Sequence, residues 1–170
     1  MDTKLINATL RFNIEYAKQC VIDVKEDLMT FSPYPGLENH PSFTLGHLVS
    51  GKALVIRALN GDYQLPQNWK ELFGRNGPGD PRRPESNHGQ YPSKQDLLNE
   101  LNASNDVLLD AIENTKESEM IQPYSWKYSS IFPNLKDMVW FMCSIHESMH
   151  LGQLAAWRRA VDLPSALARV

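Results

Sequence analysis

The feature that most constrains the fold of this chain is an apolar stripe, at helical spacing, that also carries two histidines. The stripe lies between about Asn134 and Val161, and at roughly 1.5 Å per residue the predicted helix is about 40 Å long. Its members are Leu135, Val139, Met142, Cys143, His146, Met149, His150, Gln153 and Trp157. A helix with such a stripe buries it against other helices. We therefore expect the two histidines on a buried face.

Three further segments predict long helices. The first covers residues 5–31, the second begins at Pro41 and stops at Asn60, and the third begins at Ser93 as an N-cap and ends at 115–118. The stripe of the first segment is expected to comprise Leu5, Thr9, Phe12, Tyr16, Val21, Val24 and Leu28. No strand pattern is present. The sequence thus predicts a single all-α domain over 1–170, an antiparallel or crossover four-helix bundle with long loops and a short C-terminal helical tail.

Residues 62–92 form the irregular part of the sequence, because they contain five prolines and four glycines. Trp69, Leu72 and Phe73 form an apolar cluster that we expect to dock a short turn on the body of the protein. A loop of this length is usually functional or mobile. Two interpretations therefore stay open, a disordered segment and a lid.

Composition excludes several function classes. The net charge of −3 gives no electrostatic reason to expect a nucleic-acid or anionic-membrane partner. No segment reaches the apolar length of a membrane span, and we expect no signal peptide, because no long apolar run follows the first residues. The two cysteines, Cys20 and Cys143, make no disulfide framework. We expect a cytoplasmic protein.

Three histidines are the candidate metal ligands. His146 and His150 lie one turn apart on one helix face, and His47 lies on the apolar side of the second helix. A single inward histidine is usually a core residue with a satisfied hydrogen bond, but three in one core are costly unless something unites them. A divalent cation does so, and three protein ligands leave a position open for water or substrate. Neutral imidazoles suit zinc, nickel, copper or iron.

His146 to His150 also match H-E-x-x-H, the metalloprotease pattern in which the glutamate is the general base. No Glu follows Glu147 and no His follows His150, so the third ligand of a protease is absent. Gln153 and Ala156 occupy positions that the extended protease pattern requires. We therefore reject the protease. Glu147 either reaches metal-bound water or is solvated, and metal-dependent hydrolysis with Glu147 stays an alternative.

Two motifs resemble those of the DinB-like superfamily. They are Asn-His-Pro-Ser-Phe-Thr-Leu-Gly-His-Leu at 39–48 and His-Glu-Ser-Met-His-Leu-Gly-Gln at 146–153, followed by Arg158 and Arg159. The resemblance implies a four-helix bundle, often a homodimer, with a divalent ion, commonly nickel or zinc, on His47, His146 and His150. Characterised members include thiol S-transferases and a maleylpyruvate isomerase that use bacillithiol, mycothiol or glutathione. Two positions depart from the family pattern, Met149 and Asp162.

The resulting hypothesis is a metal-dependent thiol S-transferase with a small-molecule thiol and an electrophile as substrates. The metal would make the thiol a nucleophilic thiolate. Glu147 and Gln153 are the candidate catalytic residues, although Gln153 could equally be a polar residue bonded to a loop. Cys143 is either a fourth ligand or a small hydrophobe, and we favour the hydrophobe. The alternative from another class is a non-catalytic, stress-linked protein that binds metal and ligand.

The arginines Arg57, Arg158 and Arg159 could meet carboxylates of a peptide-like thiol. Surface charge is the default interpretation for all three.

Overall fold

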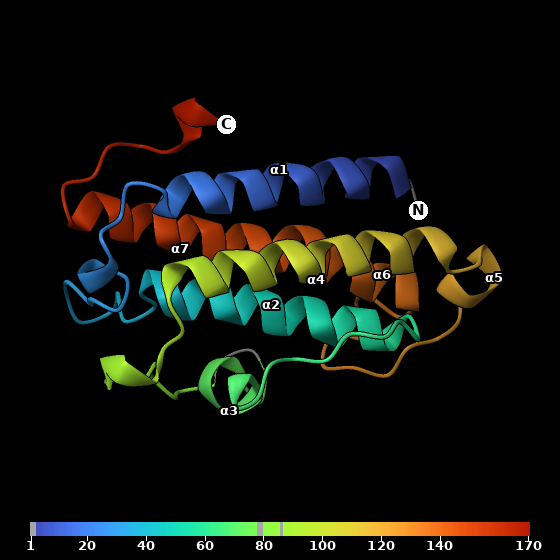
Figure 1. The fold of residues 1–170 in the computed structure, drawn as a ribbon. Helices are drawn as coiled ribbons and strands as arrows, with labels where there is room; N and C mark the ends of the chain where they lie inside the picture. The colour runs from blue at the N-terminus through green and yellow to red at the C-terminus, as the bar shows by residue number, and fades with distance from the viewer. Residues whose placement is uncertain (1–2, 78–79, 86) are drawn as a thin grey trace.

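The computed structural model describes residues 3–77, 80–85 and 87–170, and its long helices pack into a bundle (Figure 1). These helices are α1 (Thr3–Val21), α2 (Pro41–Ala58), α4 (Lys94–Asn114) and a composite of α6 (Leu135–Trp140), a π-helical segment (Phe141–His146) and α7 (Glu147–Ala160). The shorter elements are α3 (Trp69–Phe73), α5 (Glu117–Met120) and the 3₁₀ turns Glu26–Leu28, His88–Gln90 and Leu167–Arg169. Within the described ranges no strand occurs. The prediction of an all-α fold is confirmed.

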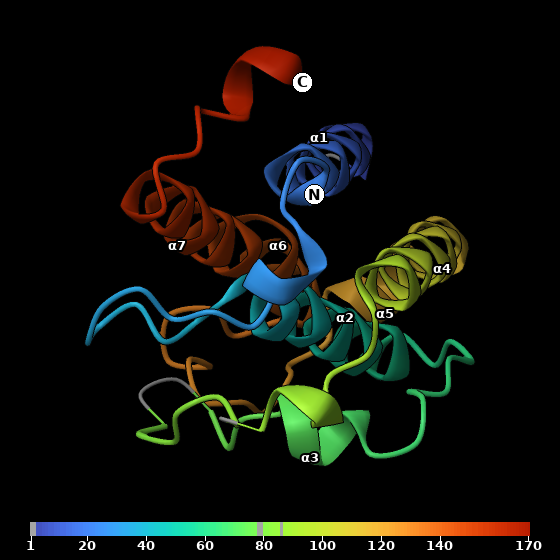
Figure 2. The same cartoon turned by 60° about the vertical axis from the view of Figure 1, so that its left-hand side comes forward.

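The bundle has a crossover topology. α1 and α7 run in one direction and α2 and α4 in the other, as the colour ramp in Figure 1 shows. The connection from α2 to α4 therefore returns along the length of the bundle, and it carries α3. Figure 2 shows α3 on the outer side of α2, away from α1. Of the two topologies that the sequence left open, the crossover is the one observed.

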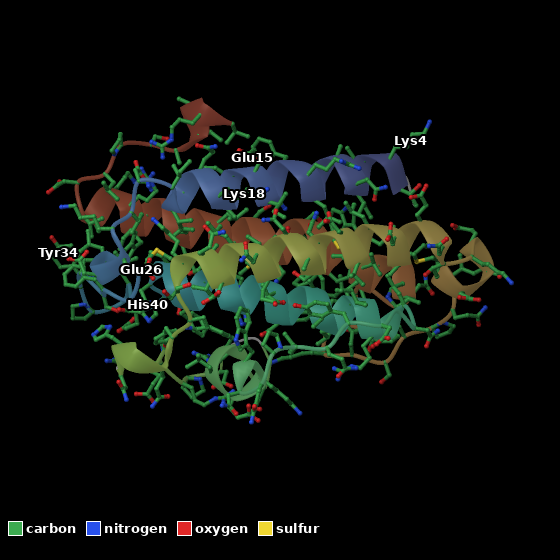
Figure 3. The ribbon with its side chains drawn as sticks, viewed as in Figure 1. Lys4, Glu15, Lys18, Glu26, Tyr34 and His40 are labelled. Carbon is green, nitrogen blue, oxygen red and sulfur yellow. The ribbon has the colours of Figure 1, made fainter. Side chains whose placement is uncertain are left out.

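The starts of α2 and α4 follow from local sequence. Pro41 takes the first position of α2, where its missing N–H has no intrahelical partner to lose. The Oγ of Ser93 accepts the backbone N–H of Asp96, 3.1 Å away, at the start of α4. Figure 3 places His40, the residue before Pro41, at the same end of the bundle as Glu26 and Tyr34, with Lys4 at the other end.

The first helix differs from its prediction in length and in buried face. It ends at Val21 rather than near Phe31. Beyond this end the Nζ of Lys94 donates to the carbonyl of Val24 at 2.6 Å, and Val24 and Met29 are buried in the core. The expected stripe was wrong in its first part, where Leu5 is 62% exposed and Phe12 48% exposed, whereas Val21 and Val24 are buried as expected. The buried face consists of Ile6, Leu10, Asn13, Ala17, Cys20 and Val21. Because Asn13 is polar, the sequence pattern did not identify this face as an apolar stripe.

The last long helix contains a π-helical segment that the sequence did not predict. Buried residues recur every four positions across it, at Val139, Cys143, Glu147 and Leu151. In a regular α-helix, positions four residues apart drift steadily around the helix axis and leave a given face. A π turn contains more residues and so cancels this drift. Because the buried face shifts in this way, Met149, which was expected to be buried, is 59% exposed.

The crossover connection packs on α2 through α3. Trp69 and Phe73 are buried, as the apolar cluster predicted. The packing of Phe73 on α2 explains why residue 46 is a glycine, because a Cβ at Gly46 would lie 2.4 Å from the ring of Phe73. The described parts of the connection thus bring α3 onto the first half of α2.

In the described part of the chain, the helices that form are too short or too polar to cross a lipid bilayer.

Candidate metal centre

The three predicted ligands meet on adjacent faces of α2 and the composite last helix. Ring centroids of His47 and His150 are 4.5 Å apart, those of His146 and His150 are 4.6 Å apart, and those of His47 and His146 are 5.3 Å apart. One nitrogen of each ring lies within 4.8 Å of the others. Two segments separated by about a hundred residues therefore present imidazoles to a single point, as the sequence predicted.

His47 is held in one tautomer by the crossover connection. Its Nδ1 lies 2.8 Å from the carbonyl oxygen of Phe73, and a carbonyl only accepts hydrogen bonds, so Nδ1 carries the proton. The lone pair of Nε2 is left free. The ring also stacks on Phe43, with centroids 5.4 Å apart and planes inclined by 14°. Hydrogen bonds of this kind orient histidine ligands in metal sites.

His150 is held in the same way by Gln153. The Oε1 atom of Gln153 lies 3.1 Å from Nδ1 of His150 and also accepts Nδ2–H of Asn39 at 2.9 Å. Because this oxygen is an acceptor, His150 also carries its proton on Nδ1 and presents Nε2. Gln153 therefore contacts a candidate ligand and a loop residue together, which joins the two roles that the sequence analysis weighed against each other.

Burial keeps the three imidazoles neutral. Burial, with a smaller contribution from the neighbouring imidazoles, lowers the pKa of His146 to about 3 and that of His150 to about 4. Burial likewise lowers the pKa of His47, against the hydrogen bond to Phe73. At neutral pH all three rings thus offer lone pairs. A convergent set of neutral imidazoles with two fixed tautomers fits a borderline divalent cation.

Cys143 does not join this group, which consists of the three histidines in the described part of the chain. The thiol is 1% exposed, and burial together with nearby Glu147 raises its pKa to about 12. A thiol in this state is a small hydrophobe rather than a thiolate ligand. Three protein ligands leave coordination positions open, as catalytic sites do.

Glu147 is buried inside the bundle, a position that neither of the two sequence interpretations predicted. It is 4% exposed, so the solvated interpretation is wrong. One carboxylate oxygen pairs with Nζ of Lys52, and the other accepts Nδ2–H of Asn13 at 2.9 Å. With both oxygens engaged inside the bundle, Glu147 offers no free carboxylate to activate a water, and the hydrolytic alternative loses its base.

The arginines singled out from the sequence do not form one group at the histidines. Arg158 is 1% exposed and pairs with Asp23 at 2.5 and 2.9 Å, so surface charge was the wrong expectation for it. Arg57 and Arg159 are exposed. An arginine whose charge does act on a candidate ligand is Arg75, which, in addition to burial, lowers the pKa of His47. The sequence analysis missed Arg75 because no pattern marks it within the crossover connection.

Arg75 lies over the ring of Phe43, which also stacks with His47, and its guanidinium carbon is 4.2 Å from the centroid of that ring. It also lines a hollow of about 740 Å³ beside α3, shared with Arg82 and Arg83 and with the carboxylates of Glu71 and Glu85. A cationic side chain therefore lies one aromatic ring away from a candidate ligand.

Comparisons with known proteins agree with this architecture. A family model described as the DinB superfamily matches residues 13–154. The chain is also similar to a solved structure, the crystal structure of the conserved protein of locus from Enterococcus faecalis. That similarity has a TM-score of 0.74 at 22% sequence identity and covers 95% of this chain and 98% of the other. Among curated proteins, none matches this sequence.

Proposed function

The chain belongs to the DinB superfamily, and from that premise we propose that it binds a divalent transition-metal ion and acts as a metal-dependent low-molecular-weight-thiol S-transferase. The ligands in this proposal are His47, His146 and His150. Its substrates are a small-molecule thiol and an electrophile. The ion is zinc or nickel first, with iron and copper as the next candidates, because neutral imidazoles accept all four.

The observation that carries the proposal is the fixed orientation of two ligands. Phe73 and Gln153 hold His47 and His150 with Nδ1 protonated, so that both rings present Nε2 near the same point. A histidine that serves only as a core residue needs no such convergence. This arrangement supports a prepared metal site whose remaining positions are open to a substrate.

An ion bound there would supply the chemistry that lowers the pKa of a coordinated thiol toward neutral pH. The protein's own residues do the positioning. Gln153 keeps His150 in the ligating tautomer while it bonds to Asn39. Arg75 places a positive charge beside the site, where a carboxylate of a peptide-like thiol could be held.

The first experiment measures metal and turnover together. Protein purified without a histidine tag is analysed for bound elements, then incubated with bacillithiol, mycothiol, glutathione or cysteine and a chromogenic electrophile. We expect one metal ion per chain and turnover with at least one thiol, both lost in His150→Ala. His88→Ala is the matched control, since His88 is exposed and lies outside the histidine group.

Two outcomes would contradict the proposal. Bound metal without turnover for any thiol would instead support the non-catalytic binding protein. Turnover that survives His150→Ala would remove the metal centre from the reaction. The proposal includes a homodimer, which sedimentation velocity of the tag-free protein tests.

A further inference from the structure

Four buried polar side chains, each from a different long helix, meet at the start of α7. They are Asn13 of α1, Lys52 of α2, Asn105 of α4 and Glu147 of α7, each at most 5% exposed. Isolated buried charges are very costly, so such groups persist only when they are paired and hydrogen-bonded. The second residue of the H-E-x-x-H string is the centre of this cluster, and the proposed function does not use it.

The contacts within the cluster satisfy both carboxylate oxygens of Glu147. Lys52 pairs with Oε1 and also donates to Oδ1 of Asn105 at 3.1 Å. Asn13 donates to Oε2 at 2.9 Å. The same Nδ2 of Asn13 lies 3.2 Å from the carbonyl oxygen of Cys143. Asn13 therefore bonds to two points of the last helix that are four residues apart.

Those two points span the change from π to α winding. Cys143 lies inside the π-helical segment, and Glu147 is the first residue of α7. His146 lies between them, as the last residue of the π-helical segment. The direction in which His146 projects depends on where the extra residue of the π turn is placed. A contact that fixes Cys143 and Glu147 together fixes that placement.

We propose that Asn13, Lys52 and Glu147 are positioning residues of the metal centre, which hold the π-to-α junction and thereby direct His146 toward His47 and His150. This inference rests on the proposed function, because it assigns the cluster a role in that same centre. It gives the glutamate of the H-E-x-x-H string a role other than that of a general base.

The ion pair between Lys52 and Glu147 has a second consequence for the metal centre. A carboxylate next to a ligand in sequence is itself a good donor for a divalent cation. The ammonium of Lys52 holds this carboxylate inside the bundle and cancels its charge. Lys52 thereby keeps the donor set at three neutral imidazoles.

The test uses Co²⁺ as the probe and two variants of the full chain. Glu147→Gln keeps the shape and removes the charge. The double variant Lys52→Met with Glu147→Met replaces the ion pair by apolar side chains, a change that often leaves folding intact. Asp23→Asn is the control, since it weakens another ion pair of α7, in which the buried Arg158 meets the partly exposed carboxylate of Asp23.

We expect both cluster variants to bind Co²⁺ about 10- to 100-fold more weakly, the range typical when a group that supports a metal ligand is lost. The Co²⁺ absorption bands should also change, while Asp23→Asn stays within about twofold of the parent protein. If the folded double variant keeps both the affinity and the spectrum, the cluster only stabilises the fold and the inference is wrong.

A measurement without metal separates this inference from the proposed function. Long-range ¹H–¹⁵N spectra of the metal-free protein report each imidazole tautomer. In Glu147→Gln we expect the signals of His146 to move or broaden, while His47 and His150 keep Nδ1 protonated. Unchanged His146 signals would overturn the positioning role even if the parent protein binds no metal.

Discussion

The imidazole of His146 packs directly against the backbone of Gly51. A Cβ built on Gly51 would lie 3.2 Å from Cε1 and 3.6 Å from Nδ1 of the ring. Gly51 lies one helical turn after His47 on α2, so the two positions share a face. Because Gly51 has no side chain, the ring of His146 on the last helix approaches α2 closely enough to meet His47.

Gly51→Ala should therefore weaken metal binding while improving helix propensity. The ring of His146 must shift by a few tenths of an ångström. We expect about a tenfold loss of Zn²⁺ affinity, near 1.4 kcal/mol, because such a shift takes up much of the roughly 0.5 Å within which a site residue must be held. Isothermal titration calorimetry measures the Zn²⁺ affinity of the variant and of the parent protein.

The matched control is Gly152→Ala, because a Cβ there meets nothing within 4 Å. It should stabilise the fold by roughly 1 kcal/mol and leave the affinity unchanged. Equal affinities for both alanine variants would mean that the approach of His146 to α2 is not critical.

Gln153→Leu should lower metal affinity about 10- to 100-fold, because Nδ1 of His150 loses the acceptor that fixes its tautomer. The same change at Gln95, an exposed residue of α4 that bonds to Asn99, is the control. Competition with a chromogenic chelator gives both affinities. A Gln153→Leu protein that binds as tightly as the parent would show that His150 needs no such partner.

His40 should make the metal-free protein acid-sensitive. Its Nδ1 accepts the N–H of Phe43 at the start of α2, and burial lowers its pKa to about 4. The unfolded chain takes up this proton near pH 6.5, so native stability is lost as the pH falls from about 6.5 toward 4. At pH 4.5 the loss from His40 should be about 2–3 kcal/mol.

His40→Asn keeps an acceptor for the N–H of Phe43 and removes the titrating ring. Urea unfolding of the metal-free proteins at pH 7.5 and 4.5 gives the comparison. The other histidines contribute to the pH dependence of both proteins alike. Identical pH dependence for parent and variant would exclude His40 as its source.

Removing the metal should lower thermal stability. An ion that binds only the folded protein stabilises it by about 4 kcal/mol at a free concentration a thousand times Kd. Calorimetry with and without a chelator should show a lower Tm after removal. His150→Ala should show little difference, and a chelator effect of equal size in that variant would place the stabilising ion elsewhere.

Local signals predicted much of the fold. Pro41 and Ser93 marked two helix starts, because a proline and a capping hydroxyl act on neighbouring backbone groups alone. The pairing of His146 with His150 followed from helical periodicity. The likeness of two motifs to a known superfamily then linked them to His47.

What the sequence did not predict depends on distant partners. The buried face of α1 includes Asn13, whose side-chain amide donates to two groups of the last helix. Arg158 resembles a surface charge until Asp23 and the carbonyl of Cys20 surround it. The π-helical segment likewise has no local signature, since packing against the other helices determines it.

The carbonyl of Phe73 that accepts from His47 belongs to the connection between α2 and α4. Surface connections usually change length freely between relatives. Here the chain up to Phe73 must keep its path, whereas the stretch that follows has no bond to a histidine of the centre among the described residues. Because Arg75 still packs on Phe43 beside His47, insertions and deletions in homologues should accumulate after Arg75 rather than before it, and grafted segments will be tolerated there first.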